Sequence, residues 1–116
     1  MMSDASRAMS ETRVLIVEDD ADLREALTDT LRAAGITAQG AADAADALRL
    51  LEQGGIGLVI SDVHMPGMDG SDLLGAIKRR WLDLPVVLMT AHASVARAVE
   101  AMREGAVDYI VKPFDA

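Results

Sequence analysis

The sequence contains no cysteine, which excludes disulfide bonds, thiol catalysis and zinc sites built on cysteine. Aromatic residues are almost absent: only Trp81, Tyr109 and Phe114 occur, so a core must be built from aliphatic side chains. No apolar run approaches the ~20 residues of a membrane-spanning helix, and the N-terminus lacks the apolar region of a signal peptide. These absences favour a soluble protein of the cytoplasm.

Basic residues are also scarce, because 11 Lys and Arg stand against 19 Asp and Glu, giving a formal net charge of −8. This balance argues against nucleic-acid binding by this chain, since phosphate contacts need clustered Lys and Arg. The triplet Lys78–Arg80 is interpreted as a solvated helix face rather than a binding patch. The 116 residues, 51% of them hydrophobic, suit one folded domain over residues 13–116, after a polar leader over residues 1–12 that we expect to be disordered.

Unbroken apolar runs predict strands that are buried on both faces, as in a parallel sheet. Three such runs are Val14–Val17, Leu58–Ser61 and Val86–Met89, and Tyr109–Val111 is a shorter one. A weaker strand is predicted over Ile36–Gly40, where alternating polar residues suit the edge of a sheet.

Helical periodicity fills the segments between these runs. Leu23, Leu27 and Leu31 recur every fourth residue after Asp20, a candidate cap, with Arg24 on the polar face and Gly35 at the end. The other apolar stripes are Ala44, Ala47, Leu48 and Leu51 after Asp43, then Leu73, Leu74, Ile77 and Trp81 after Ser71 or Asp72, then Val95, Val99 and Met102 before Gly105. Alternating strands and helices predict an α/β fold with a parallel sheet and helices on both of its faces.

Functional side chains follow four of the predicted strands, where parallel strands share one edge of the sheet. Glu18 and Asp19 follow the first strand, Asp62 the third, Thr90 ends the fourth, and Lys112 follows the fifth. On position alone, Asp62 could be a metal ligand, a nucleophile or a group that caps the loop. If the first and third strands are neighbours, three carboxylates converge, and a hard divalent cation such as Mg²⁺ relieves their repulsion.

This set of groups suits phosphoryl transfer, which asks the protein mainly for position and countercharge. Asp62 would attack phosphorus, Mg²⁺ and Lys112 would neutralise the equatorial oxygens, and Thr90 would hydrogen-bond one of them.

Four motifs with matching order and spacing carry a family resemblance. They are V-L-I-V-E-D-D (Val14–Asp20), S-D-V-H-M-P-G-M-D-G (Ser61–Gly70), L-M-T-A-H (Leu88–His92) and D-Y-I-V-K-P-F (Asp108–Phe114). The chain resembles, from Arg13 to Asp115, the receiver domain of a bacterial two-component response regulator. The resemblance implies a flavodoxin-like three-layer sandwich with a five-stranded parallel sheet of order 2-1-3-4-5. It also implies that Asp62 accepts a phosphoryl group from a sensor histidine kinase, and that the domain is no enzyme beyond catalysing its own phosphorylation and dephosphorylation.

The same resemblance assigns roles to individual residues. Asp19 and Asp62 would bind Mg²⁺ directly, the backbone carbonyl of His64 would be the third protein ligand, and Glu18 would act through water. Thr90 and Tyr109 would form the conformational switch, while Lys112-Pro113 would carry a cis peptide bond. The residues that tune how fast the acyl phosphate hydrolyses would be His64, Ala91 and His92; we reject imidazole ligation, because a hard cation among carboxylates does not call for it.

The wording of these motifs is most similar to receivers of the nitrogen-regulator type. Such receivers precede an AAA+ ATPase that activates an alternative sigma factor, followed by a DNA-binding helix-turn-helix, which implies a transcription-activating output. Receivers normally finish with a fifth helix after K-P-F, where this sequence has only Asp115 and Ala116. We expect that helix to be missing or truncated, leaving an apolar face that a second copy of the chain covers.

Two alternatives remain open from the residues alone. One is a Mg²⁺-dependent phosphohydrolase with an aspartyl nucleophile, although Asp20-Ala21-Asp22-Leu23 departs from the D-x-D-x-T/V motif that such an enzyme would need. The other is a receiver-like interaction module that is never phosphorylated. Incubation with Mg²⁺ and a small phosphodonor separates the three hypotheses.

Overall fold

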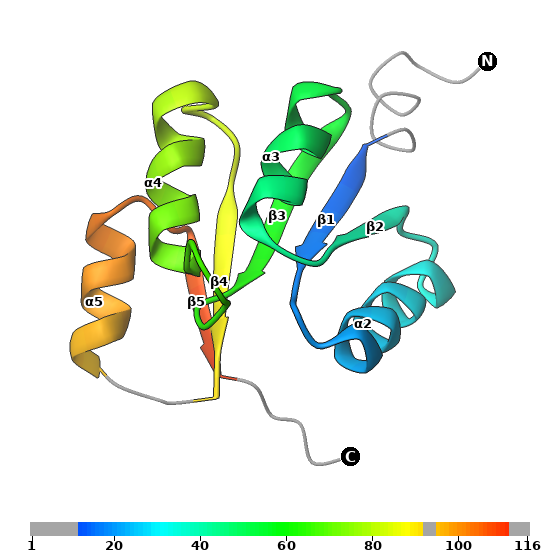
Figure 1. The fold of residues 1–116 in the computed structure, drawn as a ribbon, viewed down its shortest axis with the longest axis horizontal. Coiled ribbons are helices and arrows are strands. Elements are labelled where there is room, and N and C mark those ends of the chain that lie inside the picture. The colour runs from blue at the N-terminus through cyan, green and yellow to red at the C-terminus, as the bar shows by residue number, and fades with distance from the viewer. Residues whose placement is uncertain (1–11, 92–94, 112–116) are drawn as a thin grey trace.

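The computed structural model describes residues 12–91 and 95–111 of the chain. Its elements, in order, are β1 (Arg13–Val17), α2 (Ala21–Ala33), β2 (Ala38–Ala41), α3 (Ala44–Glu52), β3 (Ile56–Asp62), α4 (Gly70–Arg80), β4 (Val86–Thr90), α5 (Val95–Arg103) and β5 (Asp108–Val111). The strands form one sheet of order β2-β1-β3-β4-β5, with every pair parallel, and their arrowheads all point the same way in Figure 1. The predicted flavodoxin-like fold and strand order are confirmed.

The register of the central strands brings their carboxyl ends to one edge. Val17 of β1 pairs with Ser61 of β3, and Ser61 pairs in turn with Leu88 of β4. Apolar side chains anchor this arrangement, because Leu15, Val17 and Val59 are fully buried. Glu18, which directly follows β1, and Asp62, the last residue of β3, are therefore neighbours in space.

Aspartate caps start three of the helices. The side chains of Asp20, Asp43 and Asp69 accept hydrogen bonds from backbone N–H groups in the first turns of α2, α3 and α4. The predicted starts of α2 and α3 are confirmed, but the prediction of Ser71 or Asp72 for α4 is wrong. The true cap lies earlier because Asp69 accepts from the Asp72 N–H, which leaves Gly70 as the first helical residue.

The edge strand is also displaced from its predicted position. β2 covers Ala38–Ala41 rather than Ile36–Gly40, although its edge position is confirmed. The Ile36 N–H closes the end of α2 by donating to the Leu31 carbonyl at 2.9 Å, and Gly35 adopts a φ of +84° in this turn. The turn thus uses a residue that the hydrophobic pattern gives to the strand.

Helices cover the two faces of the sheet unequally. Right-handed crossovers put α2 on one face and α3, α4 and α5 on the other, and α3 and α4 lie in front of the strands in Figure 1. The core on that side includes Ala47, Leu50 and Leu51 of α3 with Leu73, Leu74 and Ile77 of α4, and Leu48 and Trp81 pack at its border.

The prediction that the apolar stripe of α5 faces the core is wrong. Val99 and Met102 are 44% and 48% exposed, and the helix presents the buried Ala101 to the core instead. The sequence offers only a few apolar residues on this helix, and alanine is uninformative about its phase. The side chain of Val95 lies outside the described part of the structure.

On the α2 side, an apolar groove of about 300 Å³ remains over the sheet. Two of its members in β5, Ile110 and Val111, are 38% and 45% exposed. The residues that line this "β5 groove" are Ile16, Leu27, Thr30, Leu31, Ile60, Met89, Ile110 and Val111. The predictions for the leader before Thr12, for a fifth helix and for a cis Lys112-Pro113 bond concern segments outside the described residues.

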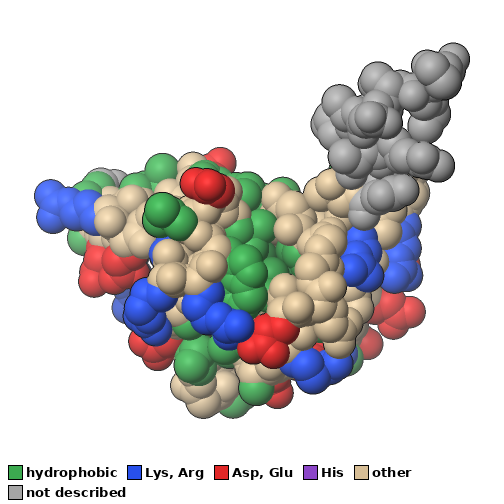
Figure 2. All heavy atoms as spheres, turned by 90° about the horizontal axis from the view of Figure 1, so that it is seen from above, with side chains coloured by type: hydrophobic (Ala, Val, Ile, Leu, Met, Phe, Trp, Pro, Cys, Tyr) green, Lys and Arg blue, Asp and Glu red, His purple; other side chains and the backbone are tan. Residues whose placement is uncertain are grey.

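Figure 2 views the molecule from the edge of the sheet where the strands begin, opposite their carboxyl ends. A hollow of about 490 Å³ there is lined by apolar side chains that include Ile56, Trp81 and Leu84. Arg80 stacks 4.3 Å above the Trp81 ring and pairs with Glu52 at 3.0 Å. Arg79 and Arg80 are exposed, as predicted for a solvated helix face. The prediction is wrong for Lys78, which is only partly exposed and donates from its Nζ to the Leu84 carbonyl at 2.6 Å. No described helix is long and apolar enough to cross a membrane.

Candidate functional site

Three carboxylates converge at the carboxyl edge of the sheet. Oxygen atoms of Glu18, Asp19 and Asp62 lie within 4.8 Å of one another. The pairing of Val17 with Ser61 explains this, because Glu18 and Asp62 are the next residues of the two strands' chains. Glu18 is 1% and Asp62 4% exposed, whereas Asp19 is exposed to solvent. The predicted convergence of the three acids is present.

The loop after β3 is folded back on itself around Asp62. The Asp62 Oδ1 accepts the backbone N–H of His64 at 3.3 Å, and its carbonyl accepts the Ser61 hydroxyl at 3.0 Å. The sheet ladder continues one residue further, since the Val63 N–H donates to the Met89 carbonyl at 2.9 Å. These bonds fix the backbone on both sides of Asp62.

Gly70 lets helix α4 begin directly against this loop. Its N–H donates to the Val63 carbonyl at 2.9 Å. A Cβ at this position would lie 2.3 Å from the Asp62 carbonyl oxygen and 2.8 Å from the Val63 Cα, closer than atoms can approach. A contact of this kind requires glycine, and the sequence motif alone does not predict this role for Gly70.

The predicted switch residues lie on β4, which pairs with β3, and on β5, the strand beyond it. Thr90 ends β4 and is fully buried, and Tyr109 pairs with Leu88 across β4 and β5. The Tyr109 hydroxyl is buried and has no hydrogen-bond partner in the part of the chain that the structure describes. It lines a cavity of about 260 Å³ between α4 and α5 that His64 also lines.

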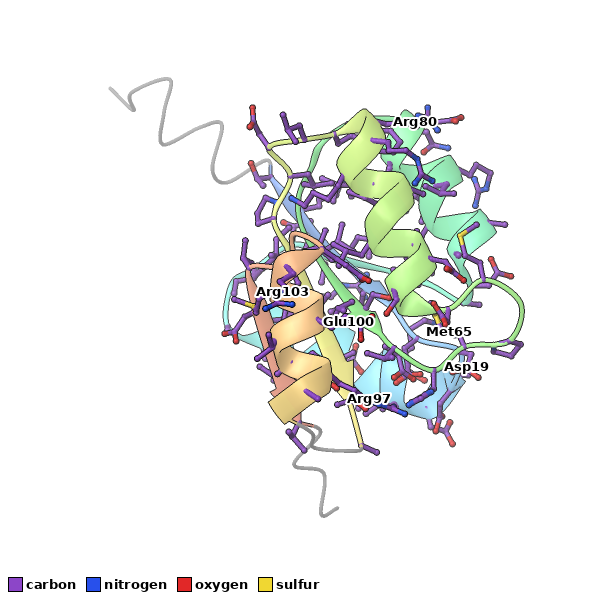
Figure 3. All side chains as sticks on the ribbon, turned by 90° about the vertical axis from the view of Figure 1, so that its left-hand side faces the viewer. Asp19, Met65, Arg80, Arg97, Glu100 and Arg103 are labelled. Atoms are coloured by element: carbon purple, nitrogen blue, oxygen red, sulfur yellow. The ribbon has the colours of Figure 1, made fainter. Side chains whose placement is uncertain are left out.

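The remaining predicted site residues are only partly within the described ranges. Ala91 is exposed directly after β4, and His64 is exposed in the loop after β3. Lys112 and His92 lie outside the described residues. Figure 3 shows Asp19 and Met65 toward the same end of the molecule as the start of α5, where Arg97 lies.

The donor set fits a hard divalent cation. In the described ranges this cluster contains only carboxylates, without histidine or cysteine, and oxygen ligands are those that Mg²⁺ prefers. Two of the three side chains are buried, so their mutual repulsion is poorly screened by solvent and a cation would relieve it.

Arg24 also contributes to the site, because it holds the backbone next to the acidic residues. Periodicity predicts only that it lies on the polar face of its helix, whereas its Nη1 donates to the Glu18 carbonyl at 2.8 Å. A signal was present in the sequence, because an arginine near the start of the helix can reach back to the end of the preceding strand. Periodicity reports the face of a helix, not the direction of a long side chain.

Comparison with known proteins decides the family. A family model described as the response regulator receiver domain matches residues 14–116. The chain is a receiver domain of the response regulator family. This confirms the resemblance based on the four motifs, and it identifies the chain as a signalling domain of two-component systems.

The receiver domain is also similar to individual regulators. It is 58% identical over 104 residues to the response regulator protein FleR of Pseudomonas aeruginosa, covering 90% of this chain and 22% of FleR. It is 43% identical over 102 residues to the DNA-binding transcriptional regulator NtrC of Escherichia coli, covering 88% of this chain and 22% of NtrC. The predicted similarity to the nitrogen-regulator type is confirmed, and the chain spans about a fifth of these relatives' length.

A solved structure supports the same conclusion. The receiver domain of NtrX from Brucella abortus superposes with a TM-score of 0.81 at 36% identity, covering 88% of this chain and 87% of the NtrX domain. The fold and the family are therefore established from both sequence and structure.

Proposed function

We propose that this receiver domain accepts one phosphoryl group on Asp62 in a Mg²⁺-dependent reaction. The observation that carries the proposal is the convergence of Glu18, Asp19 and Asp62 within 4.8 Å at the carboxyl edge of the sheet. Asp62 comes from the central strand and is held by hydrogen bonds on its flanking backbone, so its carboxylate has a defined position. A fixed nucleophile next to countercharge is what phosphoryl transfer requires.

In the proposed transfer, a carboxylate oxygen of Asp62 forms a bond to phosphorus. The bond between phosphorus and the donor breaks, and the donor, a histidine imidazole of a sensor kinase, leaves with the bonding electron pair. The domain would catalyse this step and the later hydrolysis of its own acyl phosphate, and no other reaction.

The ligands proposed for Mg²⁺ are the carboxylates of Asp19 and Asp62 and the backbone carbonyl of His64, with Glu18 acting through water. When bound, the cation supplies positive charge for the phosphoryl oxygens. Lys112 would supply a second positive charge, and the Thr90 hydroxyl would donate to one phosphoryl oxygen.

Thr90 and Tyr109 are the proposed switch. Movement of the Thr90 hydroxyl toward the phosphoryl group would leave space into which Tyr109 turns. The support for this proposal is that the buried Tyr109 hydroxyl has no hydrogen-bond partner among the described residues and borders a cavity. A side chain held in this way gains a partner by moving, so a small local change can bias its position.

A phosphodonor experiment tests the proposed function. The protein is incubated with Mg²⁺ and acetyl phosphate, and its mass is followed by electrospray mass spectrometry. We expect one added phosphoryl group that forms only with Mg²⁺ present and is lost on hydrolysis. Continuous release of phosphate from a phosphate monoester such as p-nitrophenyl phosphate would support the phosphohydrolase alternative, and an unchanged mass with acetyl phosphate would support the inert module.

His64 and His92 are proposed to tune the lifetime of the acyl phosphate. We expect His64→Ala and His92→Ala each to change its half-life severalfold, because His64 comes two residues after Asp62 in the sequence and His92 two residues after Thr90. The half-life is measured by the decay of the added mass after the phosphodonor is removed. Met68→Ala, a change of an exposed side chain in the same loop as His64, is the control; half-lives equal to the parent in both histidine variants would refute the proposal.

The partners follow from the family and are proposed on that basis. The upstream partner is a sensor histidine kinase, and the downstream partners are an ATPase and a DNA-binding domain in a longer parent chain. We propose that the domain works in the cytoplasm, on the basis of the receiver family to which it belongs.

We further propose that the β5 groove mediates self-association of this chain. Its lining is almost entirely apolar, and two members, Ile110 and Val111, are more than a third exposed. Such a face is stabilised by covering it with a matching apolar surface. In sedimentation equilibrium we expect a dimer that Val111→Glu converts to a monomer. Leu82→Glu, which adds the same charge at a residue 75% exposed at the opposite edge, should leave the dimer intact; a monomeric parent at high concentration would contradict the proposal.

A further inference from the structure

Arg24 links helix α2 to the turn that carries the acidic residues. Its Nη1 donates to the Glu18 carbonyl at 2.8 Å. Its backbone N–H donates to the Asp20 carbonyl at 2.9 Å. One residue therefore binds the carbonyl groups on both sides of Asp19.

Asp19 depends on its neighbours for its position. It is exposed, and its side chain makes no hydrogen bond within residues 12–91 and 95–111. The turn around it is held elsewhere: the Glu18 N–H donates to the Ala41 carbonyl at 3.0 Å, and the Asp20 side chain caps α2. The Asp20 N–H also donates to the Glu18 side chain at 3.4 Å. The Glu18 carbonyl is a further anchor, and Arg24 holds it.

The absence of a side chain at Gly40 leaves room for the side chain of Arg24. Gly40 lies in β2 opposite Ile16 of β1. A Cβ on Gly40 would lie 2.9 Å from Cδ and 3.0 Å from Cγ of Arg24. The aliphatic part of Arg24 thus runs directly over the strand where no side chain stands, and a methyl group there would push the guanidinium away from Glu18.

The guanidinium holds the main chain rather than the carboxylates. No ion pair to Arg24 occurs in the described parts of the chain, although Arg49 and Arg80 each pair with a carboxylate. A charged donor to a backbone carbonyl makes a strong bond, stronger than a neutral donor would make. Arg24 therefore orders the turn without competing for the oxygens that would bind a cation.

We propose that Arg24, seated over Gly40, is a positioning residue for the divalent cation. It fixes the turn from Glu18 to Asp20 so that Asp19 already faces Asp62 before the cation binds. This inference rests on the proposed function, since it takes Asp19 and Asp62 as the Mg²⁺ ligands. Groups that orient metal ligands from behind affect metal affinity strongly when they are removed.

The test measures Mg²⁺ affinity by titration calorimetry of the whole chain. Arg24→Met keeps most of the aliphatic stem and removes the guanidinium, and we expect the Mg²⁺ dissociation constant to rise about tenfold. The sign of the change is informative, because loss of a nearby positive charge would by itself strengthen cation binding. Weaker binding must then come from the lost positioning.

Arg32 provides a matched control from the same helix. Its Nη2 donates to the Ala38 carbonyl of β2 at 2.9 Å, so Arg32→Met removes the same charge and the same kind of bond at the far end of α2. We expect Arg32→Met to lower the melting temperature as Arg24→Met does, but to leave the Mg²⁺ dissociation constant unchanged. Amide hydrogen exchange at Asp19 and Asp20 in metal-free protein should accelerate in the Arg24 variant alone.

Gly40→Ala tests the same positioning role of Arg24 while the arginine itself remains present. We expect it to weaken Mg²⁺ binding in the parent and to have little further effect in an Arg24→Ala background, where the steric conflict is gone. Equal Mg²⁺ affinities in the two methionine variants would overturn the inference and leave the proposed function intact. A parent protein that binds no Mg²⁺ would overturn both.

Discussion

Asp62→Asn is expected to abolish the Mg²⁺-dependent gain of a phosphoryl group from acetyl phosphate. The substitution keeps the shape of the side chain and its backbone hydrogen bonds but removes the anionic oxygen that we propose attacks phosphorus. Loss of a nucleophile typically lowers a rate by a factor of about a thousand or more. The rate is measured by mass spectrometry of the intact chain over the time course of the reaction.

The same variant should remain folded, and this separates lost chemistry from lost structure. Glu18, Asp19 and Asp62 carry like charges close together, so removing one of them relieves repulsion when no metal is present. We therefore expect the unfolding midpoint in EDTA to stay the same or to rise. Asp83→Asn, at an exposed aspartate on the opposite edge of the sheet, is the control with the same chemical change. An adduct that forms on Asp62→Asn as fast as on the parent would refute Asp62 as the acceptor.

Gly70→Ala is expected to destabilise the fold by about 2 kcal/mol, which is typical of a side chain forced into a filled space. The added Cβ would meet the Asp62 carbonyl oxygen at 2.3 Å, so either α4 or the loop after β3 must move. The free energy of unfolding is measured by urea denaturation. Because the displaced backbone is that of Asp62 itself, we also expect slower phosphoryl transfer and weaker Mg²⁺ binding.

Gly75→Ala, in the same helix, is expected to stabilise the fold rather than destabilise it. A Cβ on Gly75 would have only an ordinary contact, 3.5 Å from an Arg79 nitrogen. Alanine in a helix interior is favoured over glycine by about 1 kcal/mol, so we expect a small gain in stability. If both alanine variants have the stability of the parent, the close approach at Gly70 does not constrain the loop.

The sequence predicted the convergence of the acids because parallel strands impose it. Once the apolar runs before Glu18 and Asp62 are assigned to neighbouring strands, the next residues must meet at one edge. The start of α4 could not be predicted as securely, because Asp69, Ser71 and Asp72 are all plausible caps, and only the folded loop selects Asp69. Local pattern defines the elements, and tertiary contacts define their ends.

The roles of Arg24 and Gly40 could not be predicted from periodicity. The two residues lie on different elements, and their contact depends on how α2 packs against β2. The phase of α5 was missed for a related reason, since Val99 and Met102 define a stripe only if the helix buries its larger side chains, and it buries Ala101. Signals that depend on packing geometry require the structure.

The way α5 rests on the sheet has a thermodynamic consequence. Burial contributes about 0.8 kcal/mol for each CH₂ group removed from water, so an alanine such as Ala101 anchors a helix far more weakly than the leucines and isoleucine of α4 do. The larger side chains of α5, Val99 and Met102, are already half in solvent and lose little if the helix shifts. Helix α5 is therefore held to the sheet by a smaller burial free energy than α4 is.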